Sequence, residues 1–476
     1  MTVRTRIAPS PTGEDIHIGN LYTALINWTV AKKNQGKFII RIEDTDRERL
    51  IEGSEQKILS TIKAYGLAYD EGPDIKGPFA PYRQSERLKL YKQYAEELIE
   101  KESAYYCFCS KEKLEELRNK NEGKANKKHL EYCDFNLDES KKRITTGEKY
   151  VIRLKVPQNK DIIFEDLIRG EITINSDQID DQILIKSDGF PTYHMAVVVD
   201  DHLMEITHVI RAEEWISSTP KHVLLYQALG WSLPIFAHLP LLRNTDRSKL
   251  SKRHNPVWAS WYLKEGFLPE AMLNYLALMG WSHPEAKEIF TLDEFVEKFE
   301  LKDVLPVGPV FNITKLEWMN GEYIRKMSGE ELTKRLEDFL VDHPSKDKIA
   351  PLTPLVKERI KKLSDFIPLV DFLFSKPDYE KSIFEKVAGD KKNLLKDILS
   401  DILSTLEKAS RPWDAKEFEQ SFRDLADKLG LSTTQIFQLI RVAISGKTVT
   451  PPLFESIKIL GEEETLNRVK TANNLF

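Results

Sequence analysis

TRIAPSP at residues 5–11, LYTALINWTVAKK at residues 21–33 and KFIIRIEDTD at residues 37–46 follow one another closely near the amino terminus. The first stretch is typical of a short strand that runs into a loop at Pro9 and Pro11, and the third is a run of strand formers. The second repeats its apolar residues with the period of a helix. A strand, a loop, a helix and a second strand in this order are typical of a parallel β-sheet. Ligands of such sheets bind at the carboxyl ends of the strands. We therefore expect the loop before the helix and the EDTD sequence to lie on one edge.

The remaining chain changes character along its length. Residues 87–99 have the spacing of an amphipathic helix. YVIRLKVP, IDDQILIKS and HMAVVVDD are all predicted as strands. The chain thus has two strand-rich parts with different residue patterns, which suggests that one domain is inserted into another. Strand signals fade after about residue 260, and from Lys326 onward the pattern is mostly charged amphipathic helix.

Length and composition limit the class of protein. A chain of 476 residues predicts about three domains. The net charge of −5 does not exclude nucleic acid, because a local basic face is enough to bind phosphates. Three cysteines form no disulfide framework, and no run of 18 apolar residues occurs. The sequence thus predicts a soluble cytoplasmic protein without a membrane span.

Two short stretches suggest phosphate chemistry. HIGN at residues 17–20 places a histidine and a glycine where a helix begins, and a helix amino terminus presents free N–H groups to phosphate. KLSKR at residues 249–253 places two lysines on one loop, which suits a triphosphate. Taken alone, each has an ordinary alternative. Asn20 can be a simple helix cap, and a run of charge is usually a solvated face.

HIGN and KLSKR together resemble the two signature sequences of class I aminoacyl-tRNA synthetases. RIAPSPTG, KFIIRIEDTD, YRQSER, YCFC, IRLKVP, FAHLP and GFLPEAMLNYLALMGW then occur in the order seen in glutamyl-tRNA synthetases. This resemblance implies an α/β fold: a Rossmann-like parallel-sheet catalytic domain with an inserted α/β acceptor-binding domain, followed by an all-α anticodon-binding region. It also implies ATP-dependent attachment of glutamate to the 3′ end of tRNA-Glu through glutamyl-adenylate, with Mg²⁺ bridging the phosphates.

The resemblance also implies which residues form the site. Catalysis would rest on His17, Lys249 and Lys252. ATP would be bound by Pro9, Gly19, Asn20, Lys249, Ser251 and Lys252. Glutamate would be bound by Arg6, Ser10, Glu43, Tyr193, Arg211 and Trp215. The arginines would take the carboxylates and Glu43 the ammonium group, although a salt bridge is the ordinary alternative for each arginine. Asn20 departs from the usual HIGH, and Val197 stands where some relatives carry Asn.

The cysteines resemble a zinc-binding element that some members of this family carry. Its expected ligands are Cys107, Cys109, His129 and Cys133. Three cysteines and one histidine form a valid tetrahedral set for structural zinc. The alternative is that these cysteines are plain small hydrophobic residues.

For tRNA the resemblance implies several contact regions. The expected domains are a catalytic domain of residues 1–83 and 194–245, an inserted acceptor-end domain of residues 84–193, a stem-contact domain of residues 246–327 and a helical anticodon-binding region of residues 328–476. Arg359, within the basic KERIKK stretch, is a candidate anticodon reader. The chain is expected to be a monomer.

Several other functions remain open at this stage. A non-discriminating form would also charge tRNA-Gln with glutamate. A glutamine–tRNA ligase would need a β-barrel at its carboxyl end, and a tRNA-modifying relative would lack the anticodon-binding part. A catalytically inactive tRNA-binding paralogue would not need to keep the signature residues.

Overall fold

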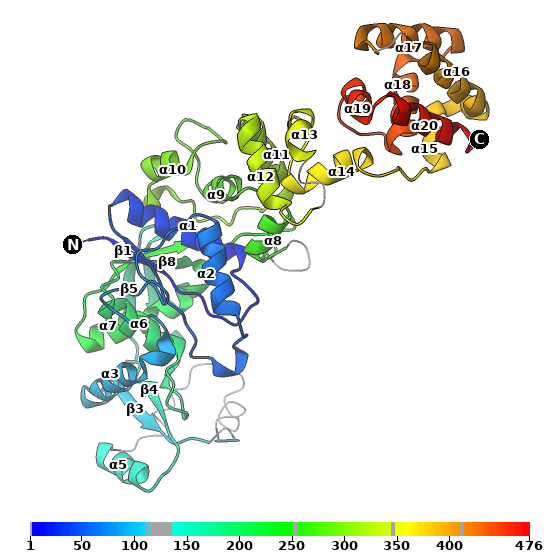
Figure 1. Cartoon of the computed structure of the whole chain (residues 1–476). Coiled ribbons are helices and arrows are strands. Elements are labelled where there is room, and N and C mark those ends of the chain that lie inside the picture. Colours follow the sequence, from blue (N-terminus) through cyan, green and yellow to red (C-terminus); the bar gives the residue numbers. More distant parts are fainter. Residues whose placement is uncertain (1, 111, 114–135, 251–255, 344–347, 410–412) are drawn as a thin grey trace. The chain divides into compact units, whose positions relative to one another are not determined.

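The computed structural model describes residues 2–110, 112–113, 136–250, 256–343, 348–409 and 413–476 (Figure 1). The chain divides into two compact units. One comprises residues 1–264 and 269–316, and the other comprises residues 265–268 and 317–476. Within the described residues, all named strands belong to the first unit. The expected α/β fold with a helical carboxyl-terminal part is confirmed.

The expected strand–helix–strand unit is present at the amino terminus. β1 (Arg4–Ile7) and β2 (Lys37–Ile40) pair in parallel, and α1 (Ile18–Lys33) connects them. α1 is buried without interruption from Leu21 to Ala31, because it packs on the strands and on α9 (Pro269–Ala277) and α10 (Leu292–Lys298).

The larger sheet continues this parallel arrangement. Its strand order is β6 (Gly170–Asn175), β5 (Asp161–Asp166), β9 (Ile235–Leu239), β8 (His208–Ala212), and only β6 runs antiparallel to its neighbour. β1 lies beside β8, where the main-chain N–H of Arg4 donates to Thr207 Oγ1 at 2.8 Å (Figure 1). The carboxyl ends of β8, β9 and β5 therefore face the same edge, which is where ligands of parallel sheets bind.

A smaller antiparallel sheet forms part of the inserted segment. It contains β3 (Ala104–Cys107), β4 (Val151–Leu154) and β7 (Ile183–Ile185) in that order. α3 (Leu88–Glu100) packs against β3 and β7, and α5 (Leu137–Thr145) lies between β3 and β4 along the chain. The prediction of a helix over residues 87–99 is thus confirmed, as are strands in YVIRLKVP and IDDQILIKS.

The prediction of a strand in HMAVVVDD is wrong. These residues lie in α6 (Tyr193–Leu203), and every residue from Met195 to Asp201 is buried. A short apolar run that is buried on all sides lacks the periodicity that distinguishes a helix from a strand. Its three consecutive valines favoured the strand, but packing against α3 and α7 (Thr219–Leu229) overrides that preference.

The remaining elements are helices. In the first unit these are α2 (Ser54–Ala64) and α8 (Ala259–Lys264), and α11 (Ile313–Lys326) leads into the second unit. The second unit contains α12 (Gly329–Phe339), α13 (Ile349–Val356), α14 (Phe366–Val370), α15 (Lys381–Ala388), α16 (Leu395–Lys408), α17 (Ala415–Leu429), α18 (Thr433–Ser445), α19 (Leu453–Leu460) and α20 (Glu462–Asn473). Apolar side chains of α15 to α20 form a common core. No helix among the described residues has the length and apolar character that crossing a bilayer requires.

Candidate active site

The HIGN sequence forms the amino terminus of α1. His17 is the capping residue, and its Nδ1 accepts a hydrogen bond from the main-chain N–H of Gly19 at 3.0 Å. The alternative in which Asn20 caps the helix is therefore wrong. Because Nδ1 accepts, the neutral imidazole carries its proton on Nε2, which can donate to a phosphate oxygen. A side chain at position 19 would approach His17 Nδ1 to 3.2 Å, so the glycine keeps this cap uncrowded.

A pocket of about 220 Å³ opens beside this helix end. Its lining residues are His17, Gly19, Asn20, Tyr22, Thr23, Ala212, Glu214, Leu239, Pro240, Leu241, Leu242, Lys249 and Leu250. The HIGN and KLSKR stretches are separated by more than two hundred residues in the chain, yet residues of both line this pocket. Lys249 Nζ lies 2.5 Å from Glu214 Oε2, in an exposed ion pair.

Not every residue expected to bind ATP lies in this lining. Pro9 is buried outside it, and its carbonyl accepts a hydrogen bond from the N–H of Glu43 at 3.0 Å. Ser251 and Lys252 lie outside the described residues, so their placement remains a prediction.

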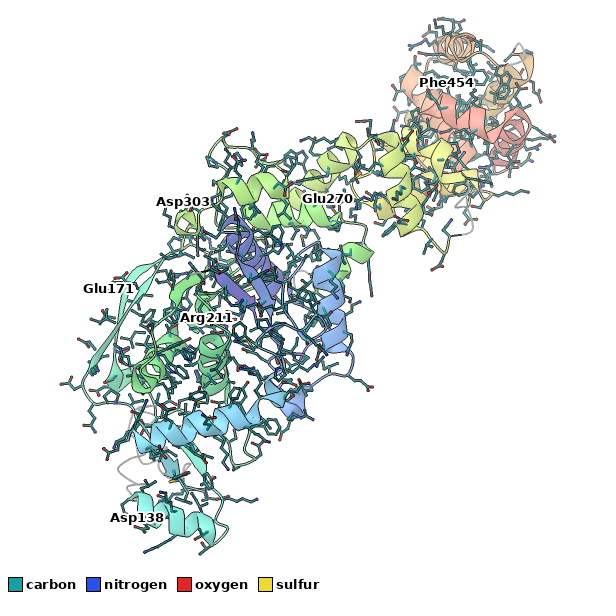
Figure 2. The ribbon with its side chains drawn as sticks, turned by 60° about the vertical axis from the view of Figure 1, so that its left-hand side comes forward. Asp138, Glu171, Arg211, Glu270, Asp303 and Phe454 are labelled. Atoms are coloured by element: carbon teal, nitrogen blue, oxygen red, sulfur yellow. The ribbon has the colours of Figure 1, made fainter. Side chains whose placement is uncertain are left out.

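Arg211 lies next to two other expected glutamate-binding residues, Tyr193 and Trp215. It is buried at the end of β8, next to pocket-lining Ala212 (Figure 2). Its Nη1 donates to the hydroxyl of Tyr193 at 3.0 Å, and the rings of Tyr193 and Trp215 lie 4.3 Å apart between centroids. This cluster has an arginine at its base and aromatic rings beside it, which suits a small carboxylate ligand.

Arg6 is placed differently. Its Nε and Nη2 donate to the two carboxylate oxygens of Asp201, at 3.0 and 3.1 Å, in an almost fully buried pair. The salt-bridge alternative therefore describes Arg6, whereas Arg211 has no such partner among the described residues. Ser10 is exposed.

Glu43 lies beside a second buried arginine. Arg41 Nη2 is 3.5 Å from Glu43 Oε1, and Arg41 Nη1 is 2.7 Å from Asp201 Oδ1. Burial raises the pKa of the Glu43 carboxyl to about 7, and the positive charges of Arg41 and Arg6 only partly oppose this effect. For Arg41 the neighbouring carboxylates outweigh burial and raise its pKa, so it stays charged.

Comparison with known proteins identifies the family. The description "tRNA synthetases class I (E and Q), catalytic domain" matches residues 2–318, and "Anticodon binding domain" matches residues 331–473. A glutamate–tRNA ligase of Acidothermus cellulolyticus is 45% identical over 99% of this chain and 95% of its own length. One from Thermus thermophilus is also 45% identical, over 99% of each chain. The chain belongs to the glutamate–tRNA ligase family.

A solved structure of this family has the same fold. The glutamate tRNA ligase of Elizabethkingia meningosepticum, crystallised in complex with its amino acid, superimposes with a TM-score of 0.86 at 35% identity. The superposition covers 100% of this chain and 99% of that chain. The resemblance drawn from the sequence is thus confirmed over the full length.

Several residues around the site were not predicted from the sequence. Arg41 precedes Glu43 by two positions, and this i, i+2 spacing in an extended stretch could have indicated a shared face. Asp201 is the partner of Arg6 from 195 residues away, and no local pattern indicates such a pair. His222 and His238 both contact Arg211, at 3.3 and 3.1 Å. Val197 is buried in α6 and offers no polar group.

Other site predictions fall on distant parts of the chain. Cys107 ends β3 and Cys109 follows it, whereas His129 and Cys133 lie outside the described residues. The described residues alone contain no group of ligands that could hold a metal ion. In the second unit Arg359 is exposed. Burial and, next, the positive charge of Arg359 lower the pKa of Arg441.

Proposed function

We propose that this chain attaches glutamate to the 3′ end of tRNA-Glu in two steps. In the first step the α-carboxylate of glutamate attacks the α-phosphorus of ATP, which forms glutamyl-adenylate and releases pyrophosphate. In the second step a hydroxyl of the terminal ribose of tRNA attacks the acyl carbon, and AMP is released. Arg211 carries this proposal, because it is a buried cation that meets only neutral acceptors in a chain 45% identical to named glutamate–tRNA ligases.

Glutamate would be held by its three charged groups. Arg211 binds one carboxylate, and Tyr193 and Trp215 form the wall beside it. Glu43 in its charged form binds the ammonium group. Arg6 already uses Nε and Nη2 for Asp201, so it contacts the substrate through its remaining nitrogen, Nη1.

ATP would bind at the amino terminus of α1. The Nε2 proton of His17 is donated to a phosphate oxygen, and the helix end adds its own N–H groups. Lys249 moves from Glu214 to the phosphates and stabilises the negative charge that develops during transfer, together with Lys252. Glu214 is the single carboxylate among the described lining residues, which fits a Mg²⁺ ion held mainly by phosphate oxygens. Bound Mg²⁺ would neutralise charge on the departing pyrophosphate.

Recognition of tRNA would use the other regions. We propose that residues 84–193 hold the acceptor end, residues 246–327 contact the stem and residues 328–476 bind the anticodon. Arg359 is an exposed cation in the last region, which suits contact with phosphates and bases. Arg359→Ala should raise the KM for tRNA-Glu and leave the KM for glutamate unchanged. Arg423→Ala, which removes an exposed arginine paired with Glu419, is the matched control.

Zinc remains part of the proposal for the inserted segment. Cys107 ends β3 and Cys109 follows two positions later, so the two thiols are close together along the chain. Metal analysis of the purified chain should then find about one zinc per molecule. The Cys109→Ser variant should lose it, whereas a metal-free wild-type protein would overturn the proposal.

Aminoacylation with labelled glutamate tests the activity. The assay compares tRNA-Glu, tRNA-Gln and no tRNA, with ATP and Mg²⁺ present. Charging of tRNA-Glu alone supports the discriminating ligase, and charging of both supports the non-discriminating form. Folded protein that charges neither would favour a tRNA-binding paralogue. We further propose that the chain acts in the cytoplasm and as a monomer. Sedimentation with and without tRNA tests the monomeric state.

A further inference from the structure

Arg211 is enclosed by hydrogen-bond acceptors that carry no charge. Its Nε donates to His238 Nε2 at 3.1 Å. Its Nη1 faces Tyr193 and His222, and its Nη2 donates to Thr219 Oγ1 at 2.9 Å and lies 3.5 Å from the carbonyl oxygen of Trp215. All five N–H groups of the guanidinium therefore face neutral partners.

Four other buried arginines of the same unit form ion pairs, whereas Arg153 donates to the carbonyl oxygen of Asp181. Arg4 is paired with Glu71, Arg6 and Arg41 with Asp201, and Arg87 with Asp200. A buried charge without a counter-ion is costly. The absence of a carboxylate around Arg211, within the described part of the chain, is therefore a property that needs an explanation.

The hydrogen bonds determine which nitrogen of each histidine carries the proton. A guanidinium only donates, so His238 Nε2 and His222 Nδ1 must both accept. His238 then carries its proton on Nδ1 and donates it to Asp166 Oδ2 at 2.6 Å. His222 carries its proton on Nε2 and donates it to His194 Nδ1 at 3.1 Å. Both imidazoles are neutral in this arrangement, and burial lowers the pKa of each.

The strands of the parallel sheet build this arrangement. Arg211 on β8 and His238 on β9 are direct partners in the register, and Asp166 ends the next strand, β5. The other carboxylate oxygen of Asp166, Oδ1, accepts the main-chain N–H groups of Ile168 and Arg169 at 3.0 and 3.1 Å. Asp166 is thus fixed in orientation and can act only as an acceptor toward His238.

We propose that His238, oriented by Asp166, and His222 are positioning residues that hold the guanidinium of Arg211 and leave its charge for the substrate. This inference rests on the proposed function, in which Arg211 binds a carboxylate of glutamate. The histidines provide the geometry that a carboxylate partner would otherwise provide, but they do not neutralise the cation. The ligand then supplies the missing negative charge.

A pair of variants of nearly equal shape tests the role of charge. His222→Gln keeps a neutral acceptor toward Arg211, whereas His222→Glu places a counter-ion there. In aminoacylation of tRNA-Glu, the KM for glutamate should be about tenfold or more higher for the glutamate variant than for the glutamine variant. The KM for ATP should not separate them. Equal KM values for glutamate in the two variants would overturn the inference.

Asp166→Asn tests the orientation of His238. The two main-chain donors should retain the oxygen of the asparagine, so its NH₂ group would face His238 Nδ1. The proton of His238 would move to Nε2 and point at the Nε–H of Arg211, which places donor against donor. We expect a rise in the KM for glutamate of about tenfold. An unchanged value would show that Asp166 has no positioning role.

Controls separate this inference from the proposed function. His283 is buried in the same unit and pairs with Glu294 instead of Arg211, and His283→Gln should retain the wild-type KM for glutamate. If the wild-type protein charges tRNA-Glu but the paired variants behave alike, only the positioning role fails. If the wild-type protein charges no tRNA, the proposed function fails and this inference fails with it.

Discussion

Arg41 and Asp201 form an ion pair at 2.7 Å in the interior of the first unit, and no part of the Arg41 side chain is exposed. Asp201 also holds Arg6, and Arg41 also faces Asp200 and Glu43. Three carboxylates therefore share one buried guanidinium, although Asp201 is also paired with Arg6 and Asp200 with Arg87. The position of the expected ammonium-binding group, Glu43, is coupled in this way to the stability of the unit.

Replacement of this arginine should strongly destabilise the unit. Arg41→Met would leave the carboxylates of Asp200, Asp201 and Glu43 short of a cation, and breaking a buried pair costs about 3–5 kcal/mol. Urea unfolding followed by fluorescence measures the effect. Arg49→Met is the matched control, because Arg49 forms an exposed pair with Asp46. The control should change the free energy of unfolding by less than about 1 kcal/mol. Similar losses in both variants would contradict the prediction.

Removal of the Lys249 ammonium should lower kcat more than it changes KM. This cation is expected to act on charge that develops only during transfer, so Lys249→Ala should reduce kcat by about 100-fold. Steady-state aminoacylation at varied ATP measures both constants. Lys37→Ala, which removes another exposed and paired lysine, should leave them unchanged. A rise in the KM for ATP at constant kcat would assign Lys249 to ground-state binding.

Acidic solution should weaken the binding of glutamate. The pKa of Glu43 is raised to about 7, so its carboxylate form predominates only above that pH. If this form binds the ammonium group, kcat/KM for glutamate should fall as the pH decreases below about 7. Glu43→Gln has no titrating carboxyl here, so it should lack this dependence and have low activity at every pH. A wild-type profile that is flat between pH 6 and 8 would contradict the role of Glu43 (these limits lie about one unit from its pKa).

The hydroxyl of Tyr193 should matter for glutamate and not for ATP. Tyr193→Phe removes the group that accepts from Arg211 Nη1 at 3.0 Å. Hydrogen bonds to charged groups are strong, so the KM for glutamate should rise about tenfold. Tyr275→Phe is a suitable control, because its hydroxyl accepts from the N–H of Asn312 elsewhere in the unit. A shift in the KM for ATP of equal size would indicate general damage to the fold.

Structural features that depend on nearby residues could be predicted from this sequence, whereas contacts between residues far apart in the chain could not. The βαβ unit was predictable because its periods and its turn residues lie within about forty positions. α6 was mistaken for a strand, since burial on all sides erased its period. The roles of the arginines depend on partners far away in the chain. Within the described residues, Arg6 is paired with a carboxylate and Arg211 is not. Strand register and helix packing bring Asp201 to Arg6 and His238 to Arg211.

α6 has a mechanical consequence for the site. It begins with Tyr193, whose hydroxyl meets Arg211, and carries Asp201, the counter-ion of Arg6, in its last turns. They are eight positions apart in one helix, which is about 12 Å along its axis. The length of α6 thus sets the distance between Tyr193, which contacts Arg211, and Asp201, which contacts Arg6. An inserted residue would turn Asp201 by about 100° relative to Tyr193, so this segment should tolerate no change in length.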